Sequence, residues 1–99
     1  MTSVSIIEAR EIAERRKALS DHLKRLLIDR LSLQLEVDEI ADDSPLFGAG
    51  LGLDSVDALE VAISVETEFN VSITDEDLHA FRSINTVLDF IAMHSGDRK

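Results

Sequence analysis

The chain contains no cysteine, no tryptophan and no tyrosine, and it has only one proline and four glycines. The absence of cysteine excludes disulfide bonds, thiolate metal sites and a cysteine nucleophile, so a reactive sulfur would have to be supplied from outside the chain. No apolar run approaches the roughly 20 residues needed to cross a bilayer. The first residues also lack the charged start, apolar block and small-residue cleavage site of a secretory signal. We therefore expect a cytoplasmic protein without membrane insertion.

Basic residues are scarce, with ten Lys or Arg against twenty Asp or Glu and a formal net charge of −10. Residues 1–35 hold seven basic and five acidic side chains, a balance of +2, whereas residues 36–99 hold three and fifteen, a balance of −12. The acidic part should repel nucleic acid and anionic lipid and attract basic protein surfaces. An alternative interpretation is that its charge only keeps a small domain soluble.

A length of 99 residues and a hydrophobic fraction of 44% predict one folded domain with a modest core. Residues 6–35 carry apolar side chains at helical spacing without a glycine or proline. This pattern predicts one long helix, or two helices with a boundary near residues 18–20, where Ser20 and Asp21 form a plausible N-cap and first-turn acid. We interpret Arg15, Arg16 and Lys17 as a solvated helix face.

Residues 36–53 have no helical period and contain Pro45 and three of the four glycines, which predicts a long connection. The sequence Asp43-Ser44-Pro45 indicates a turn within it. Apolar side chains are expected to fix this loop against the core, namely Val37, Ile40, Leu46, Phe47, Leu51 and Leu53.

A second helix of about four turns is predicted from Ser55 onward. Asp54 occupies the N-cap position, and Asp57 completes an Asp-x-x-Asp variant of the capping box. A serine beside free helix N-terminal amides favours a phosphate ester, although Ser55 could equally serve as a second capping residue. The apolar positions of this helix are Val56, Leu59, Ala62, Ile63 and Phe69, and the acidic ones are Asp57, Glu60, Glu66 and Glu68.

After Asn70 the pattern predicts a brief extended piece, then a capping box at residues 74–77 that opens a short helix to about Ala80. Ser83 or Asn85 is expected to cap the last helix, whose apolar stripe ends before Gly96. The predicted fold is all-α, a small four-helix bundle of three main helices and one short one, with a long loop between helices 1 and 2. The apolar stripe of the last helix comprises Val87, Leu88, Phe90, Ile91 and Met93.

Several familiar sites are not expected. The glycines of residues 48–52 neither follow a strand nor precede Gly-Lys-Ser/Thr, so they do not form a phosphate-binding loop. Ser55 lacks the Gly-x-Ser-x-Gly surroundings of a hydrolase nucleophile. His22, His79 and His94 lack the spacing of a metal-binding pair, and the acids of residues 38–43 lack the calcium-loop ladder. We expect neither a metal site nor a catalytic group.

The chain resembles the acyl carrier proteins and related phosphopantetheine-attachment domains over residues 21–94. The resemblance rests on Phe47, residues 51–56, the acidic helix that follows, residues 66–69 and 73–77, and Ile84. It implies that Ser55, preceded by Asp54, carries 4'-phosphopantetheine through a phosphodiester. A separate phosphopantetheinyl transferase would take this group from coenzyme A with magnesium. Its thiol would hold acyl or aminoacyl groups as thioesters.

The resemblance also implies that the protein is a substrate of its partners and not an enzyme. Acidic side chains would dock on basic patches of acyl synthases or transferases, and Asp54, Asp57, Glu60 and Glu66 match those positions. The apolar side chains of Leu53, Val56, Leu59, Ala62 and Ile63 are candidates to line the groove beside the prosthetic arm, or equally to belong to the core. We expect a monomer that binds no nucleic acid.

The chain departs from the family pattern in three places. Val56 replaces a commoner Leu or Ile, Gly48 and Ala49 stand where an acidic pair is frequent, and residues 1–19 are an additional helical extension. We expect a carrier domain at residues 20–95 and a frayed tail at 96–99. The predicted function is a free-standing acyl carrier for fatty-acid, polyketide or related lipid biosynthesis with a dedicated partner. The alternatives are an aminoacyl or peptidyl carrier and an unmodified acidic interaction module.

Overall fold

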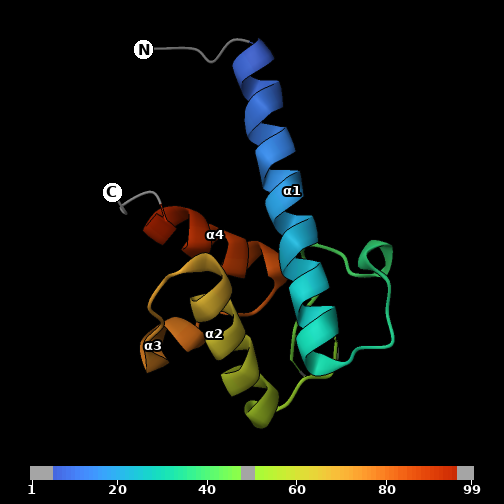
Figure 1. The fold of residues 1–99 in the computed structure, drawn as a ribbon, viewed down its shortest axis with the longest axis vertical. Helices are drawn as coiled ribbons and strands as arrows, with labels where there is room; N and C mark the ends of the chain where they lie inside the picture. Colours follow the sequence, from blue (N-terminus) through green and yellow to red (C-terminus); the bar gives the residue numbers. More distant parts are fainter. Residues whose placement is uncertain (1–5, 48–50, 96–99) are drawn as a thin grey trace.

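The computed structural model describes residues 6–47 and 51–95, so the predictions for Gly48, Ala49 and residues 96–99 lie outside the described part. This part contains four α-helices and one short 3-10 helix, and no strand, only two isolated bridges. The all-α bundle prediction is confirmed (Figure 1), while the 3-10 helix was not predicted. The elements are α1 (Ile6–Leu31), η1 (Val37–Glu39), α2 (Ser55–Phe69), α3 (Asp75–Leu78) and α4 (Ile84–Ser95).

Helix α1 is continuous, so the proposed helix boundary near residues 18–20 is wrong. Ser20 is buried in the middle of the helix, and its hydroxyl donates to Oδ1 of Asp42 in the loop at 2.8 Å. The helix ends at Leu31 and does not reach Leu35. Ser32 adopts a left-handed conformation with φ of 54°, and the N–H of Leu33 donates to the carbonyl of Ile28 at 3.0 Å, which is the closing bond of a Schellman motif.

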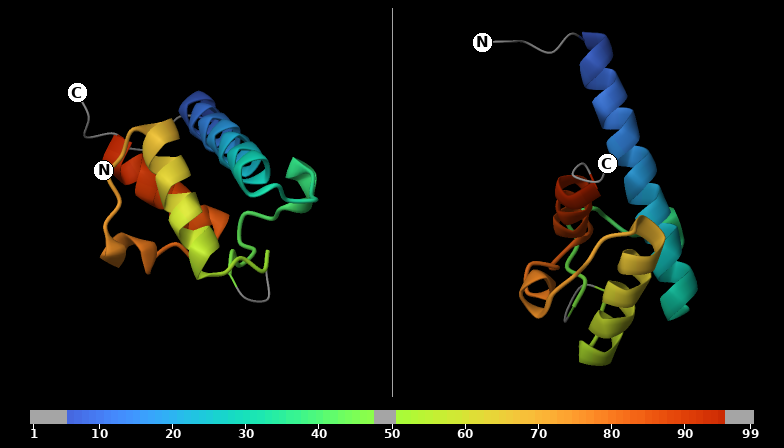
Figure 2. Two further views of the ribbon diagram at one scale, coloured as in Figure 1. Left: turned by 60° about the horizontal axis from the view of Figure 1, so that its bottom comes forward. Right: turned by 60° about the vertical axis from the view of Figure 1, so that its left-hand side comes forward.

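Helices α2 and α4 both pack against α1, whose N-terminal turns rise past the other helices (Figure 1 and Figure 2). The molecule measures 44 × 29 × 20 Å. At 1.5 Å per residue a helix as long as α1 spans about 39 Å, so α1 sets the longest dimension. No helix in residues 6–47 and 51–95 is long and apolar enough to cross a bilayer.

The core lies where α1, α2 and α4 meet, and the loop and Phe81 close it. Phe81 meets Phe90 edge to face, with ring centroids 5.4 Å apart. Removing such apolar surface from water is the main favourable contribution to folding. The side chains that are at most 2% exposed include Leu23, Leu27, Ile40, Leu46, Val61, Val65, Phe81, Ile84, Val87, Leu88 and Ile91.

The long loop is fixed to the core as predicted. Ile40, Leu46 and Leu53 are at most 6% exposed, and the partly buried Phe47 and Leu51 pack against the core. Val37, in η1, is only partly buried, and the core cluster of the described residues does not include it. The N–H of Leu46 donates to the carbonyl of Arg82 at 2.8 Å, and the N–H of Leu53 donates to the carbonyl of Leu46 at 3.2 Å. These bonds hold both ends of the segment that leads into α2.

Side-chain caps begin both α3 and α4, as predicted. Thr74 and Asp77 form the capping box of α3, and the backbone hydrogen bond from Thr74 lowers the pKa of the Asp77 carboxyl. At α4 the cap is Ser83 and not Asn85, because Thr86 donates its N–H to the Ser83 hydroxyl at 3.3 Å. The predicted apolar stripe of α4 is buried except for Met93, which is 66% exposed.

Candidate functional site

The start of α2 is fixed by a reciprocal pair of acidic side chains. Asp54 lies in the extended conformation before the helix, and the N–H of Asp57 donates to its Oδ1 at 3.0 Å. In return, the N–H of Asp54 donates to Oδ2 of Asp57 at 3.0 Å. The predicted Asp-x-x-Asp capping box is therefore present. This capping box fixes the start of α2 at Ser55.

Ser55 is exposed at this first position of α2. Among the described residues, the backbone N–H groups of Ser55 and Val56 have no acceptor, whereas those of Asp57 and Ala58 are bonded to Asp54. Free N–H groups at the positive end of a helix dipole favour a nearby anion. The carboxylates of Asp54 and Asp57 weaken this local potential. The arrangement therefore fits a singly charged phosphodiester on the serine oxygen better than a more highly charged group.

The segment that precedes Ser55 is held in place by contacts with the core. Leu53 is 6% exposed and pairs through its backbone with the fully buried Leu46. Gly52 has φ of 75°, a conformation that favours glycine because it has no Cβ. Anchored side chains therefore bring Asp54 and Ser55 to the surface at a defined place.

Helix α2 carries apolar residues on two opposite faces. Val61, Ala62 and Val65 are buried against the rest of the bundle. On the opposite side Val56, Leu59 and Ile63 are 73%, 59% and 56% exposed, and their three- and four-residue spacing makes them neighbours. We call these three side chains the α2 apolar stripe. The pattern alone left open whether they lie in the core, and the structure places them outside it.

The acidic residues of α2 divide into two groups. Asp57 and Glu60, near the N-terminus, are partly exposed beside the α2 apolar stripe. Glu66 accepts the N–H of Ile73 at 2.7 Å, and Glu68 contacts Nε2 of His22 at 2.8 Å. The second pair is therefore used within the molecule, where it fixes the exit from α2 and the contact between α2 and α1. Of the predicted docking acids, Glu66 has the strongest competing structural role.

Sequence reasoning missed the polar contacts that join α1 to the loop and left Ser64 unmentioned. Lys24 is buried, and its Nζ lies 2.7 Å from Oδ1 of Asp42. Ser64 is fully buried in α2, and its hydroxyl has no partner among the described residues. Nothing in the spacing of these residues distinguishes them from exposed polar ones.

Residues 6–47 and 51–95 also contain no group of three His, Cys, Asp or Glu side chains that could hold a metal ion.

The sequence matches a known class, the domains to which phosphopantetheine is attached. The family model described as phosphopantetheine attachment site matches residues 21–91. An acyl carrier protein from Clostridium perfringens strain SM101 is 36% identical over 75 residues, which cover 76% of this chain and 95% of the relative. An acyl carrier protein from Phytoplasma mali is 32% identical over 71 residues, covering 72% of this chain and 75% of the relative.

The chain therefore belongs to the acyl carrier protein family. Membership implies a covalently attached 4'-phosphopantetheine and the role of a carrier, not of a catalyst. It also implies interaction with a phosphopantetheinyl transferase and with acyl-handling enzymes. The family match begins at residue 21, so the first turns of α1 lie outside it.

Proposed function

We propose that Ser55 is the attachment point of the 4'-phosphopantetheine group. The observation that supports this most strongly is the exposure of Ser55 at the first position of α2, beside two backbone N–H groups without an acceptor in the described chain. When attached, the group supplies the thiol on which acyl groups are carried as thioesters. The chain has no cysteine, so this thiol would be its only one.

The residues around Ser55 have separate tasks in this proposal. Asp54 and Asp57 fix the helix start, and Leu53 anchors the preceding segment so that the serine is presented outward. The α2 apolar stripe, together with Asp57, Glu60 and the outer edge of Glu66, forms the surface that meets basic patches on partner enzymes. Exposed charge makes such docking fast, weak and salt-sensitive, because screening acts over about 8 to 10 Å at moderate ionic strength.

We further propose that residues 20–95 act as a free-standing acyl carrier domain in the cytoplasm, with residues 1–19 as an extension for a dedicated partner. Both relatives are acyl carrier proteins, which supports acyl cargo over aminoacyl cargo. Fatty-acid, polyketide or related lipid biosynthesis are the pathways that use such a carrier. The exposed apolar and acidic side chains of α2 would also suit an unmodified interaction module, which is the competing function.

Intact-mass spectrometry separates these two functions. The full chain is incubated with coenzyme A, Mg²⁺ and a broad-specificity phosphopantetheinyl transferase. We expect the gain of one phosphopantetheinyl group, and no gain in Ser55→Ala. Ser64→Ala is the matched control, since it removes a buried serine from the same helix and should still be modified. An unchanged mass of the native chain would support the interaction module.

A further inference from the structure

Asp42, in the long loop, bonds two helices at once. Its Oδ1 accepts the hydroxyl of Ser20 at 2.8 Å and lies 2.7 Å from Nζ of Lys24, and both of these partners belong to α1. Its carbonyl accepts the N–H of Asn85, the second residue of α4, at 2.8 Å. We call this set of contacts the Asp42 junction.

The three donors of the Asp42 junction depend on this one loop residue. Ser20 is 3% and Lys24 8% exposed, so water does not replace Asp42 without a change in the packing. The N–H of Asn85 belongs to the first turn of α4, where no carbonyl of the same helix can accept it. A different arrangement of the loop would leave these donors unpaired, and an unpaired buried donor is costly, above all a charged one. The junction therefore strongly favours one arrangement of the loop.

The Asp42 junction also supplies direction that the apolar anchors of the loop lack. Within residues 6–47 and 51–95, the hydrogen bonds and ion pairs that tie the long loop to α1 all end on the carboxylate of Asp42. Burial of an apolar anchor such as Leu46 is favourable but non-directional. Hydrogen bonds restrict both distance and angle. The junction thus fixes how the loop runs along α1, while the apolar anchors hold it against the core.

A short series of backbone hydrogen bonds connects the Asp42 junction to the start of α2. A turn over residues 41–44, closed by a bond of 3.1 Å, contains Asp42. Leu46 follows this turn, and its carbonyl accepts the N–H of Leu53 at 3.2 Å. Leu53 lies two residues before Ser55. A displacement of Asp42 relative to α1 is therefore transmitted to the segment that carries the exposed serine.

We propose that Asp42 is a positioning residue for the modification of Ser55. The Asp42 junction holds the segment before α2 in the arrangement that presents the serine hydroxyl to the phosphopantetheinyl transferase. Asp42 acts through Leu46 and Leu53 and does not itself bind the prosthetic group. A segment ordered before binding spares the transferase the cost of ordering it. This inference rests on the proposed attachment at Ser55, but the state of the loop can be measured without any modification.

The first test measures the order of the loop in the full, unmodified chain. Amide hydrogen exchange is followed by NMR at Leu46 and Leu53, whose N–H groups are bonded, and at the buried Val61 of α2 as a reference for global opening. We expect Asp42→Ala to speed exchange at Leu46 and Leu53 by about tenfold more than at Val61. An equal change at all three amides would show a loss of global stability alone and overturn the proposal.

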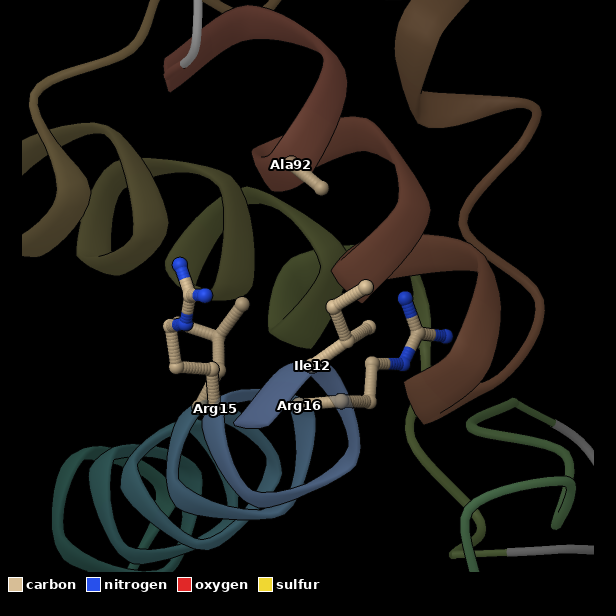
Figure 3. A pocket seen from close by; sticks show the side chains of 5 residues that line it. Ile12, Arg15, Arg16 and Ala92 are labelled. Atoms are coloured by element: carbon tan, nitrogen blue, oxygen red, sulfur yellow. The ribbon is translucent and has the colours of Figure 1, made fainter. Parts of the chain in front are cut away.

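Arg16→Ala is the matched control. Figure 3 shows Arg16 extending from α1 toward α4, where its bonds tie these two helices together. Its loss should cost a similar part of the stability, because it also breaks an ion pair and hydrogen bonds between two elements, but it leaves the carboxylate of Asp42 bonded. We expect exchange at Leu46 and Leu53 to rise no more than at Val61. A selective rise as large as that in Asp42→Ala would overturn the proposal.

The second test measures the kinetics of modification with coenzyme A, Mg²⁺ and the transferase. If only a fraction of the carrier has the competent loop arrangement, its apparent affinity falls by that fraction. We therefore expect Asp42→Ala to raise the KM for the carrier by about fivefold and to change kcat by less than about twofold. Arg16→Ala should change neither value.

A double variant separates positioning from stability. Adding Lys24→Met to Asp42→Ala removes the unpaired buried ammonium and should recover part of the stability. The KM should stay raised, because the directional tie to α1 is still absent. A KM that returns with the stability, or one that is unchanged in Asp42→Ala, would overturn this inference alone. Failure of the native chain to be modified would instead overturn the proposed function, and this inference with it.

Discussion

Arg16 of α1 and Asp89 of α4 form an ion pair at 3.0 Å between elements separated by most of the chain. The same guanidinium bonds both oxygens of Asn85. The sequence cluster of Arg15, Arg16 and Lys17 was interpreted as a solvated helix face. This interpretation fits Arg15 and Lys17, which are exposed, but it is wrong for Arg16, which connects the N-terminal half of α1 to α4.

We predict that Arg16→Ala lowers the free energy of unfolding by about 1 to 2 kcal/mol. The ion pair is partly exposed and should contribute less than about 1 kcal/mol, with the remainder from the hydrogen bonds to Asn85. Urea denaturation measures the change, and Arg15→Ala is the control, expected within about 0.5 kcal/mol of the native chain. A double-mutant cycle with Asp89→Ala isolates the pair. Equal effects of the two arginine substitutions would contradict the assignment.

The two apolar faces of α2 predict opposite outcomes for the same chemical change. Val61→Ala removes methyl groups from a fully buried site and should cost about 1 to 3 kcal/mol of stability. Val56→Ala, at a side chain that is 73% exposed, should change stability by less than about 0.5 kcal/mol. It should instead raise the KM of the phosphopantetheinyl transferase, because it removes part of the docking surface. Thermal unfolding and steady-state kinetics on both variants test this, and a Val56→Ala variant that unfolds easily with normal KM would refute it.

The contact between Lys24 and Asp42 predicts an acid-dependent part of the stability. The hydrogen bond from Lys24 lowers the pKa of the Asp42 carboxyl, burial opposes this effect, and the hydroxyl of Ser20 assists it. Because the folded-state pKa is below the unfolded value of about 3.9, the stabilisation is present above about pH 4. It is lost as the pH falls through the folded-state pKa.

Asp42→Asn should therefore cost about 1 to 2 kcal/mol near pH 7, since it leaves a largely buried ammonium without a counter-ion. The difference from the native chain should shrink as the pH falls below about 4. Urea denaturation between pH 7 and pH 3 gives both values. Adding Lys24→Met to Asp42→Asn should recover part of the loss. A difference that stays constant across the pH range would show that ionisation of Asp42 has no part in it.

The capping box predicts a change that depends on the side-chain oxygen and not on its charge. Asp54→Ala should lower stability by about 0.5 to 2 kcal/mol, whereas Asp54→Asn, which keeps an acceptor for the Asp57 N–H, should cost much less. Chemical denaturation followed by circular dichroism measures both. Equal losses in the two variants would mean that the carboxylate charge, and not the cap, stabilises this helix end.

The sequence predicted those parts of the fold that depend on local chemistry. The capping boxes at Asp54 and Thr74, the loop anchors such as Leu46, and the existence of every α-helix follow from side chains within a few residues of one another. The end of α1 was missed because Ser32 takes a left-handed conformation that few non-glycine residues adopt. Ser20 was misinterpreted as a cap because its partner, Asp42, lies 22 residues away.

In the candidate site, too, the local features were predicted and the features that depend on packing were not. The positions of Asp54 and Ser55 were predicted from capping rules. The placement of Val56, Leu59 and Ile63 was not, since a helix with apolar residues on two faces has no single amphipathic direction. Only the packing against α1 decides that the buried face carries Val61 and Val65 and leaves the α2 apolar stripe exposed.

The most direct test of the central claim is to locate the modified residue. Native chain treated with coenzyme A, Mg²⁺ and transferase is digested, and the peptides are fragmented by tandem mass spectrometry under conditions that retain the phosphodiester. We predict that the phosphopantetheinyl group is found on Ser55 alone. Its presence on another serine such as Ser64 or Ser72, or its absence from every peptide, would contradict the account.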